Sequence, residues 1–352
     1  MAHEPLWRWA LRQLHHDRIY VAARGVAGRS LFRENPLQAL VVHALLRGHG
    51  FGASSRRGTL LAERAYPGRV LRFLAGRGEE PAELEYPGSD YLPAEELSAR
   101  APDRPLIVFE NRLFSELAAP DQRKAILQLS LSLSTLRRWL WDGNMVMLNS
   151  PEALARKFAE VNAGAKVRFL SSGEFLDLLR SGDRAVVLDP MGPEVLSEEE
   201  LRRSSVVIIG GIVDRAKSMR GATKRIAEEL SREVGVELDR YRIELDGITA
   251  AVPHRLHAIL EVVLRVMLGG EGLRRAVMLS MSNRDAAWYL GMLVARRCSI
   301  DLLAARIREL EEVRGRPLSR EVLEHAARIA GCGASCRQLL VEAQARRATA
   351  EA

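Results

Sequence analysis

The sequence predicts an α/β protein whose middle part is a parallel β-sheet covered by helices on both faces. The main observation is that continuous apolar strand-like runs alternate with amphipathic helical segments between about residues 105 and 268. Before this region, helical and β-like segments are mixed, and after residue 272 the chain consists almost entirely of helix-forming residues. A chain of 352 residues with 47% apolar composition is long enough for two or three domains.

Residues 1–103 are expected to form an N-terminal α+β accessory domain. The amphipathic helical segments EPLWRWALRQLHHD and PLQALVVHALLRG alternate there with short β-like pieces and with glycine and proline breaks. The acidic, proline-rich stretch EEPAELEYPGSDYLPAEELSARAPDRP ends this region. We therefore place a domain boundary near residue 103.

Residues 104–272 are expected to form the α/β domain. One helix should run from about 121 to 141, with Leu129, Leu133 and Leu136 on its apolar face and Ser132 and Thr135 on the opposite face. The candidate strands are LIVFE at 106, MVML at 145, VRFL at 167, AVVLD at 185, VVIIGGIV at 206 and YRIEL at 241.

Residues 273–352 are expected to form an all-helical C-terminal domain. Breaks at CSID, GRPLS and GCGAS divide the helices. Ser319 is a candidate N-cap, but Val322 stands where a capping box needs an acidic or amide residue. We therefore expect this helix to begin without a capping box.

The charge of the chain favours a polyanionic partner. The formal net charge is +7, and only five of the 52 basic residues are lysine. The arginine guanidinium matches phosphate geometry, although a GC-rich genome would produce the same bias. The N-terminus MAHEPLWRWALRQLHHD lacks the apolar segment of a signal peptide, and the sequence has no uncharged apolar run of 18 residues. We therefore expect a cytoplasmic protein without a membrane span.

Several familiar sites are absent from the sequence. No strand is followed by G-x-G-x-x-G, and the P-loop, H-E-x-x-H and G-x-S-x-G motifs do not occur. His254 and His257 have no third metal ligand near them, so we expect no metal. Cys298, Cys332 and Cys336 allow one disulfide, but buried unpaired cysteines are the expected state.

Four stretches together resemble the Trm10 family of SPOUT methyltransferases, which methylate ring nitrogen 1 of the purine at the ninth nucleotide of tRNA. They are QLSLSLSTLRR at 128, VVLDPMGPEVL at 186, IIGGIVDR at 208 and ITAAVPHRLHAILEVVL at 248. The resemblance implies a C-terminal trefoil knot that binds S-adenosylmethionine in loops of small residues. The implied cofactor-binding residues are Ile209, Gly210, Gly211, Ile243, Leu245, Gly247, Ala251, Val252 and Pro253, with Pro253 in the first turn of the helix that closes the knot.

Asp214 is the candidate catalytic residue. It follows an apolar strand and two glycines, so it should lie at the carboxyl edge of the sheet, where α/β proteins bind ligands. The resemblance places this aspartate beside the target base; as an ordinary residue it would cap a turn. A guanine must lose a proton from ring nitrogen 1, whereas an adenine offers a lone pair, and Asp214 is compatible with both. We slightly favour adenine.

Further polar positions are implied to contact tRNA. Where the family commonly has an aspartate at the end of the first strand, this sequence has Glu110, whose duty is open. The implied substrate-binding residues are Gln128, Arg137, Arg138, Arg215, Lys217, Arg220, Lys224 and Arg225.

Two rival functions remain open: a SPOUT methyltransferase that acts on another RNA site, and a non-catalytic basic regulator that binds nucleic acid. Only the regulator would lack a pocket for S-adenosylmethionine. The two flanking domains could supply the RNA surface that a second subunit gives in other SPOUT proteins, so we expect a monomer.

Overall fold

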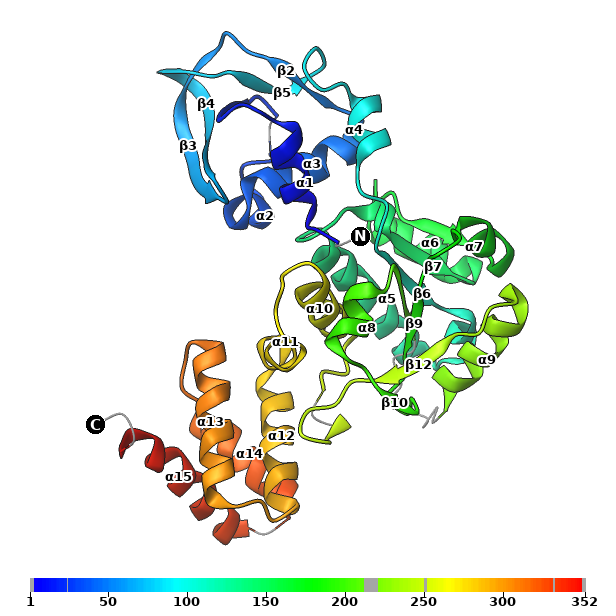
Figure 1. Ribbon diagram of the computed structural model, residues 1–352, viewed down its shortest axis with the longest axis vertical. Helices are drawn as coiled ribbons and strands as arrows, with labels where there is room; N and C mark the ends of the chain where they lie inside the picture. Colours follow the sequence, from blue (N-terminus) through cyan, green and yellow to red (C-terminus); the bar gives the residue numbers. More distant parts are fainter. Residues whose placement is uncertain (1–2, 24, 212–220, 250–251, 332, 350–352) are drawn as a thin grey trace. The chain divides into compact units, whose positions relative to one another are not determined.

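The chain forms two compact units. The computed structural model describes residues 3–23, 25–211, 221–249, 252–331 and 333–349 (Figure 1). The first unit comprises Met1–Ala185, Ser204–Ser218 and Glu233–Gly235. The second unit comprises Val186–Arg203, Met219–Arg232 and Val236–Ala352.

The N-terminal part of the first unit is an α+β module, as the sequence predicted. Its five-stranded sheet has the order β2-β5-β1-β4-β3, in which β1 is parallel to β4 and β5, and the pairs β2·β5 and β3·β4 are antiparallel. The elements are α1 (Leu6–Gln13), β1 (Arg18–Val21), α2 (Ser30–Glu34), α3 (Pro36–Arg47), β2 (Gly50–Ala53), β3 (Arg57–Tyr66), β4 (Arg69–Pro81), β5 (Leu84–Gly88) and α4 (Ala94–Arg100).

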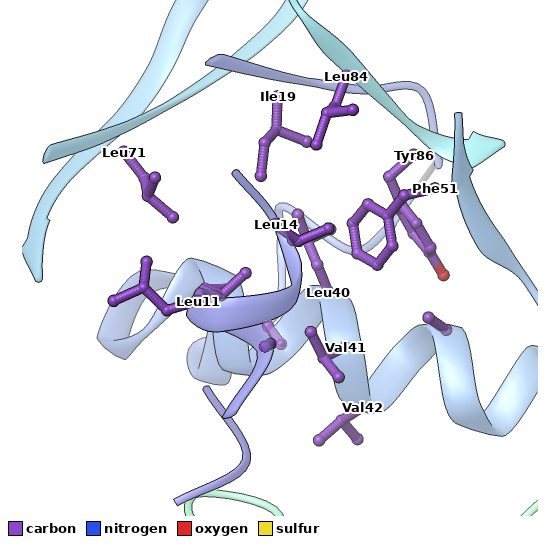
Figure 2. Close-up of a cluster of buried hydrophobic side chains, with 14 of the residues drawn as sticks. Leu11, Leu14, Ile19, Leu40, Val41, Val42, Phe51, Leu71, Leu84 and Tyr86 are labelled. Atoms are coloured by element: carbon purple, nitrogen blue, oxygen red, sulfur yellow. The ribbon is translucent and has the colours of Figure 1, made fainter. Parts of the chain in front are cut away.

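Helix α3 is the central helix of this module. The Asn35 side chain accepts a hydrogen bond from Gln38 N at its N-terminus, Pro36 occupies the first turn, and Gly48 ends the helix with φ +64°. Figure 2 shows Leu40 of this helix below Ile19 and other side chains of the sheet. Their burial forms the core of the module.

The expectation that α3 is amphipathic was wrong, because residues 36–45 are all buried. The polar side chain of Gln38 can be buried because its Nε2 donates hydrogen bonds to the carbonyl oxygens of Arg137 and Leu140, both at 2.9 Å. Trp139 O also accepts from Leu6 N at 2.7 Å. The α+β module and the segment after α5 therefore pack together within the first unit.

A seven-stranded sheet follows, with the order β10-β12-β9-β11-β6-β7-β8. The pairs β11·β6, β6·β7, β7·β8, β12·β9 and β10·β12 are all parallel, as predicted. The strands are β6 (Leu106–Glu110), β7 (Met145–Leu148), β8 (Arg168–Leu170), β9 (Ala185–Leu188), β10 (Glu194–Val195), β11 (Val206–Gly210) and β12 (Asp239–Arg242).

Two details of this sheet differ from the sequence prediction. The last strand was expected at 241–245, but β12 ends at Arg242 because Ile243 and the residues after it leave the sheet for a turn. Strand β10 was not expected, because only Glu194 and Val195 form it and both are exposed.

Helices connect the strands. They are η1 (Arg112–Glu116), α5 (Ala119–Leu136), η2 (Asp142–Asn144), α6 (Glu152–Val161), α7 (Ser172–Leu178), α8 (Glu198–Arg203) and α9 (Ala222–Val234). Helix α5 buries the predicted apolar face, but Ser132 and Thr135, expected on the opposite face, are also buried. Ser132 Oγ donates to Gln128 O at 2.8 Å, so the burial of this hydroxyl leaves its donor satisfied.

The register aligns the carboxyl ends of three strands of the first unit. Gly210 of β11 is paired with Glu110 of β6, and Glu110 is paired with Leu148 of β7. Beyond this row, Gly211 N donates to Glu110 O at 2.7 Å and Asn111 N donates to Leu148 O at 2.9 Å. The polar residues after these strands are therefore brought to one edge of the sheet.

The C-terminal part of the second unit is helical, as predicted (Figure 1). Ser319 makes no capping hydrogen bond, in agreement with the missing capping box. A Cβ at Gly291 of α12 would lie 2.8 Å from Ala326 O of α14, so this glycine allows the two helices to approach closely. The helices are α10 (Leu256–Met267), α11 (Leu273–Ser280), α12 (Asn283–Ala295), α13 (Ile300–Arg314), α14 (Arg320–Ala330) and α15 (Gly333–Thr349).

The cysteines differ in state. Cys298 is a free thiol, and burial raises its pKa. Cys336 is buried and disulfide-bonded, so the expectation of unpaired cysteines was wrong for this residue. Cys332 lies outside the described residues. Among the helices that the structure describes, none is both long and apolar enough to span a membrane.

Candidate active site

Candidate site residues occur in both compact units. Those of the first unit lie where β6, β7 and β11 end. Glu110 ends β6 with a side chain that is 0% exposed. Its Oε1 accepts from Arg112 Nε at 2.5 Å and from Asn149 Nδ2 at 3.0 Å, and its Oε2 accepts from Arg112 N at 3.2 Å. Burial raises the pKa of the Glu110 carboxyl, and the hydrogen bonds from Arg112 and Asn149 offset part of that rise.

Arg112 links Glu110 to the end of α9. Its NH1 and NH2 groups donate to the two carboxylate oxygens of Glu233, both at 2.9 Å. Ser172 Oγ, at the start of α7, donates to Glu233 Oε2 at 2.5 Å and accepts from Asn149 Nδ2 at 2.9 Å. This ring of polar contacts fixes the geometry of the sheet edge around Glu110.

Asn111 determines how closely β6 and β11 can end together. Its Nδ2 donates to Phe109 O at 2.7 Å and to Ser150 Oγ at 3.1 Å. Its Oδ1 is buried and has no hydrogen-bond partner among the residues that the structure describes. A Cβ at Gly211 would lie only 2.0 Å from this oxygen. Gly211 is therefore required for the packing of the protein itself, in addition to any close approach by a cofactor.

The candidate residues of the second unit include a tight turn between Leu245 and Ile248. The two residues exchange backbone hydrogen bonds of 2.9 and 3.2 Å, and the central Asp246 and Gly247 have φ values of +50° and +72°. Two successive left-handed residues across an antiparallel bridge form a type I′ turn, for which Asp-Gly is a preferred pair. Ile243 and Leu245 are buried beside it.

Val252 and Pro253, predicted to bind the cofactor, are also buried. The prediction that Pro253 lies in the first turn of a helix was wrong. Helix α10 begins at Leu256, and its N-cap Arg255 has an extended backbone, so Pro253 precedes the helix.

The basic residues predicted to bind tRNA occupy different environments. Arg137 donates to both carboxylate oxygens of Asp142, each at 2.6 Å, and the Asp142 side chain is 0% exposed. Arg138 pairs with Glu34 at 3.0 Å and is about half exposed. On α9, Lys224 and Arg225 pair with Glu228 and Glu229 at 3.6 and 4.0 Å. Gln128 is half-buried on α5.

The candidate catalytic residue and several of its neighbours lie outside the described residues, as does one position of the predicted cofactor loops. They are Asp214, Arg215, Lys217, Arg220 and Ala251.

Asn111, Arg112, Asn149 and Asp246 were missed by the sequence prediction as members of the site. The first three follow buried strands in ENR and LNS, so a search for polar residues directly after each parallel strand would have found them. The ion pairs of Asp246 join residues far apart in the chain and leave no local pattern. Among the described residues, no cluster of three or more His, Cys, Asp or Glu could hold a metal ion.

No protein-family model matches the chain. The chain is 30% identical over 262 residues to the tRNA (adenine(9)-N1)-methyltransferase of Sulfolobus acidocaldarius, which covers 74% of this chain and 81% of that protein. It is 28% identical over 226 residues to the tRNA (guanine(9)-/adenine(9)-N1)-methyltransferase of Thermococcus kodakarensis, which covers 63% of this chain and 59% of that protein.

Solved structures give a similar result. The fold resembles that of Sulfolobus acidocaldarius Trm10 in complex with S-adenosylhomocysteine, with a TM-score of 0.66 and 24% identity over 93% of this chain and 99% of that chain. A second structure of Sulfolobus acidocaldarius Trm10 has a TM-score of 0.54 and 28% identity, and covers 79% of this chain and 98% of that chain.

Proposed function

The chain belongs to the Trm10 family of tRNA methyltransferases, and we propose that it transfers a methyl group from S-adenosylmethionine to ring nitrogen 1 of the purine at position 9 of tRNA. The observation that carries this proposal is the 30% identity to an enzyme named for this reaction, over 81% of that enzyme's length. Adenine is our slightly favoured base, because the relative with the higher identity is named for adenine.

We propose the following organisation for this function. Residues 104–272 form the SPOUT methyltransferase domain, with its C-terminal part tied in a trefoil knot. Residues 1–103 and 273–352 form RNA-binding regions on either side of it, and the enzyme acts as a monomer in the cytoplasm, where tRNA is used.

Candidate residues in both units suit S-adenosylmethionine. In the first unit, β11 ends in Gly210 and Gly211 beside Asn111 Oδ1, a buried acceptor for an amino or hydroxyl group. In the second unit, Gly247 has a left-handed backbone conformation and no Cβ atom. A cofactor could therefore approach the backbone of this turn closely. We propose that Ile209, Ile243, Leu245, Ala251, Val252 and Pro253 complete the cofactor site. The bound cofactor supplies an electrophilic methyl group.

The target base determines what the chain must do with protons. Guanine carries a proton on ring nitrogen 1, which a general base has to remove as the methyl group arrives. Adenine needs no base there, and a carboxylate would instead stabilise the positive charge that develops on the ring. We propose that Asp214 performs both tasks.

We propose that exposed cations bind the tRNA phosphates. Arg138, Lys224 and Arg225 are about half exposed, and their surface ion pairs contribute little stability, so phosphate can replace the carboxylate partners. Arg215, Lys217 and Arg220 are proposed from the sequence for the same role, and Gln128 for a contact with the target base. Arg137, predicted to bind tRNA, is paired with the buried Asp142 and would hold η2 in place.

The experiment that tests the function uses two transcripts of one tRNA that differ only at nucleotide 9. Nucleosides from the treated transcripts are identified by mass spectrometry, and single-turnover rates are measured for the wild type and for Asp214→Asn. We expect 1-methyladenosine or 1-methylguanosine at position 9. Asp214→Asn should slow methylation of guanine by about a hundredfold or more and of adenine by less.

Calorimetry with S-adenosylmethionine serves as the control, because cofactor affinity should change little in Asp214→Asn. Methylation at another nucleotide would contradict the proposed function. Full activity of the variant on both transcripts would instead leave the function intact and reduce Asp214 to a turn residue.

A further inference from the structure

The Asp246 side chain is more heavily bonded than its turn requires. A type I′ turn needs residues that tolerate a left-handed backbone, and asparagine meets that need as well as aspartate. The carboxylate of Asp246 nevertheless receives donors from three different helices of the second unit. These contacts therefore serve a purpose other than the formation of the turn.

Two arginines form ion pairs with both oxygens of this carboxylate. Arg274 of α11 donates from NH1 to Oδ1 at 2.9 Å and from NH2 to Oδ2 at 3.3 Å. Arg306 of α13 donates from Nε to Oδ2 at 2.9 Å and from NH2 to Oδ1 at 3.2 Å. The Tyr289 hydroxyl of α12 donates a short hydrogen bond to Oδ2. The carboxylate is thus held from three sides.

A second carboxylate balances the charge of the cluster. Glu309 of α13 accepts from Arg274 Nε at 2.5 Å and Arg274 NH2 at 2.7 Å, and from Arg306 NH1 at 3.2 Å. Two carboxylates therefore face two guanidinium groups. The four side chains are between 22% and 33% exposed, so solvent screens these pairs only in part.

The backbone of the turn is held as well. Arg296, at the end of α12, donates from NH2 to Gly247 O at 3.1 Å and from NH1 to Asp246 O at 3.4 Å. The carbonyl groups at the tip of the turn are thus bonded to the same helical region as the Asp246 side chain. Side-chain and backbone contacts together fix both the position and the tilt of the turn.

The Asp246 carboxyl is suited to holding the turn and poorly suited to accepting a proton. Burial alone would raise its pKa, but the hydrogen bonds from Arg274 and Tyr289 and the charges of Arg274 and Arg306 outweigh burial and lower it. Because its oxygens are also occupied by donors, it acts through the turn that it holds.

We propose that Asp246 is a positioning residue through which helices α11, α12 and α13 set the geometry of the Leu245–Ile248 turn, and thereby the affinity for S-adenosylmethionine. This inference rests on the proposed function, which assigns Leu245 and Gly247 to the cofactor site. It gives the helical C-terminal region a role in cofactor binding in addition to any contact with tRNA.

The test measures S-adenosylmethionine affinity by calorimetry for the full-length wild type, Asp246→Asn, Arg306→Gln and the double variant. Asp246→Asn preserves the turn and removes the charge. Each single variant should raise Kd about tenfold, which corresponds to about 1.4 kcal/mol. The double variant should be no weaker than the weaker single variant, because both changes break one network. KM for the cofactor should rise with Kd, while kcat at saturating cofactor stays within about twofold.

Two further variants keep the result interpretable. Arg320→Gln removes a guanidinium from α14 of the same region, where Arg320 is 84% exposed and pairs with Glu324, and should leave Kd unchanged. Tyr289→Phe removes one donor and leaves the ion pairs in place. It should raise Kd by about two- to threefold even if the charge variants fold poorly.

Three outcomes would overturn the inference. If the variants bound S-adenosylmethionine with the wild-type Kd, whether or not their melting temperature fell, the cluster would only stabilise the packing of the helices. Additive effects of the two substitutions would show that Asp246 and Arg306 act separately. If the wild type bound no S-adenosylmethionine, the proposed function would be wrong, and this inference would fail with it. The titration of the wild type distinguishes this outcome from the other two.

Discussion

Gly211→Ala should destabilise the protein because Asn111 occupies the space that a methyl group needs. The added Cβ would lie 2.0 Å from Asn111 Oδ1 and 3.0 Å from the backbone oxygen of Glu110, whereas such atoms normally approach to about 3.5 Å. Asn111 cannot turn away freely, since its Nδ2 is bonded to Phe109 O and Ser150 Oγ. The methyl group must therefore break these bonds or move the end of β11.

Overpacking of this kind costs about 1 to 3 kcal/mol, and the lower backbone entropy of alanine in the unfolded chain offsets about 0.4 to 1 kcal/mol of it. We expect a net loss of about 1 to 2 kcal/mol, measured as a lower thermal unfolding midpoint by about 2 to 4 °C per kcal/mol. Gly173→Ala is the matched control, because a Cβ there would meet nothing within 4 Å. In a helix it should be neutral or stabilising.

The double variant Asn111→Ser/Gly211→Ala identifies the cause of the loss. Serine removes the amide oxygen from the path of the new methyl group, so the double variant should be more stable than the sum of the two single effects predicts. If Gly211→Ala melted with the wild type, or if the two substitutions were simply additive, the steric explanation would be refuted.

Three further predictions concern stability, binding and assembly. The Asp183 carboxylate accepts hydrogen bonds from Arg104 NH2 and Ser205 Oγ, both at 2.7 Å. Burial would raise the pKa of Asp183, but these hydrogen bonds outweigh it and lower the pKa from 3.8 to about 2. The folded state is therefore stabilised by about 2 kcal/mol above about pH 5, and this stabilisation is lost as the pH falls through 2. Asp183→Asn should therefore lower the urea midpoint at pH 7 and have less effect at pH 2.5, and an equal loss at both pH values would contradict this. The affinity for tRNA should fall roughly a thousandfold between 50 and 200 mM salt if six or more phosphates are contacted. If filter binding showed no dependence on salt, the positive charge would reflect amino-acid composition and not contacts with phosphate. Light scattering should give the mass of one 39.2 kDa chain, and twice that mass at micromolar concentration would exclude a monomer.

The sequence predicted the buried strands of the large sheet well because their residues are apolar on both faces. β6 and β7 are buried throughout, and a run such as LIVFE or MVML has few other stable environments. Even Glu110 at the end of β6 is buried, which the apolar pattern alone does not indicate. Its burial depends on Arg112 and Asn149, and hence on the neighbouring strand.

Long-range contacts account for the parts that the sequence did not predict. Helix α3 was expected to have a solvent-exposed face. Instead, Gln38 on this helix donates hydrogen bonds to the carbonyl groups of Arg137 and Leu140, which are about a hundred residues away in the sequence. Arg112 and Glu233 pair in the same way across 121 residues. The hydrophobic periodicity of a segment indicates which of its faces is apolar. It carries no information on hydrogen-bond or ion-pair partners that are distant in the sequence.

The carboxylates of Glu110 and Asp246 already accept hydrogen bonds from neighbouring side chains, which makes either of them a poor general base. The Glu110 side chain is 0% exposed and its oxygens face Arg112 and Asn149, so a substrate proton has no access to it. Asp246 is held by Arg274 and Arg306 and has a lowered pKa, so it is a weak proton acceptor. Neither of these carboxylates is therefore suited to take the proton that guanine must lose, so Asp214 stays our proposed general base, whereas adenine requires none. The ratio of guanine to adenine methylation is thus expected to depend on Asp214 more than on either carboxylate held by arginines.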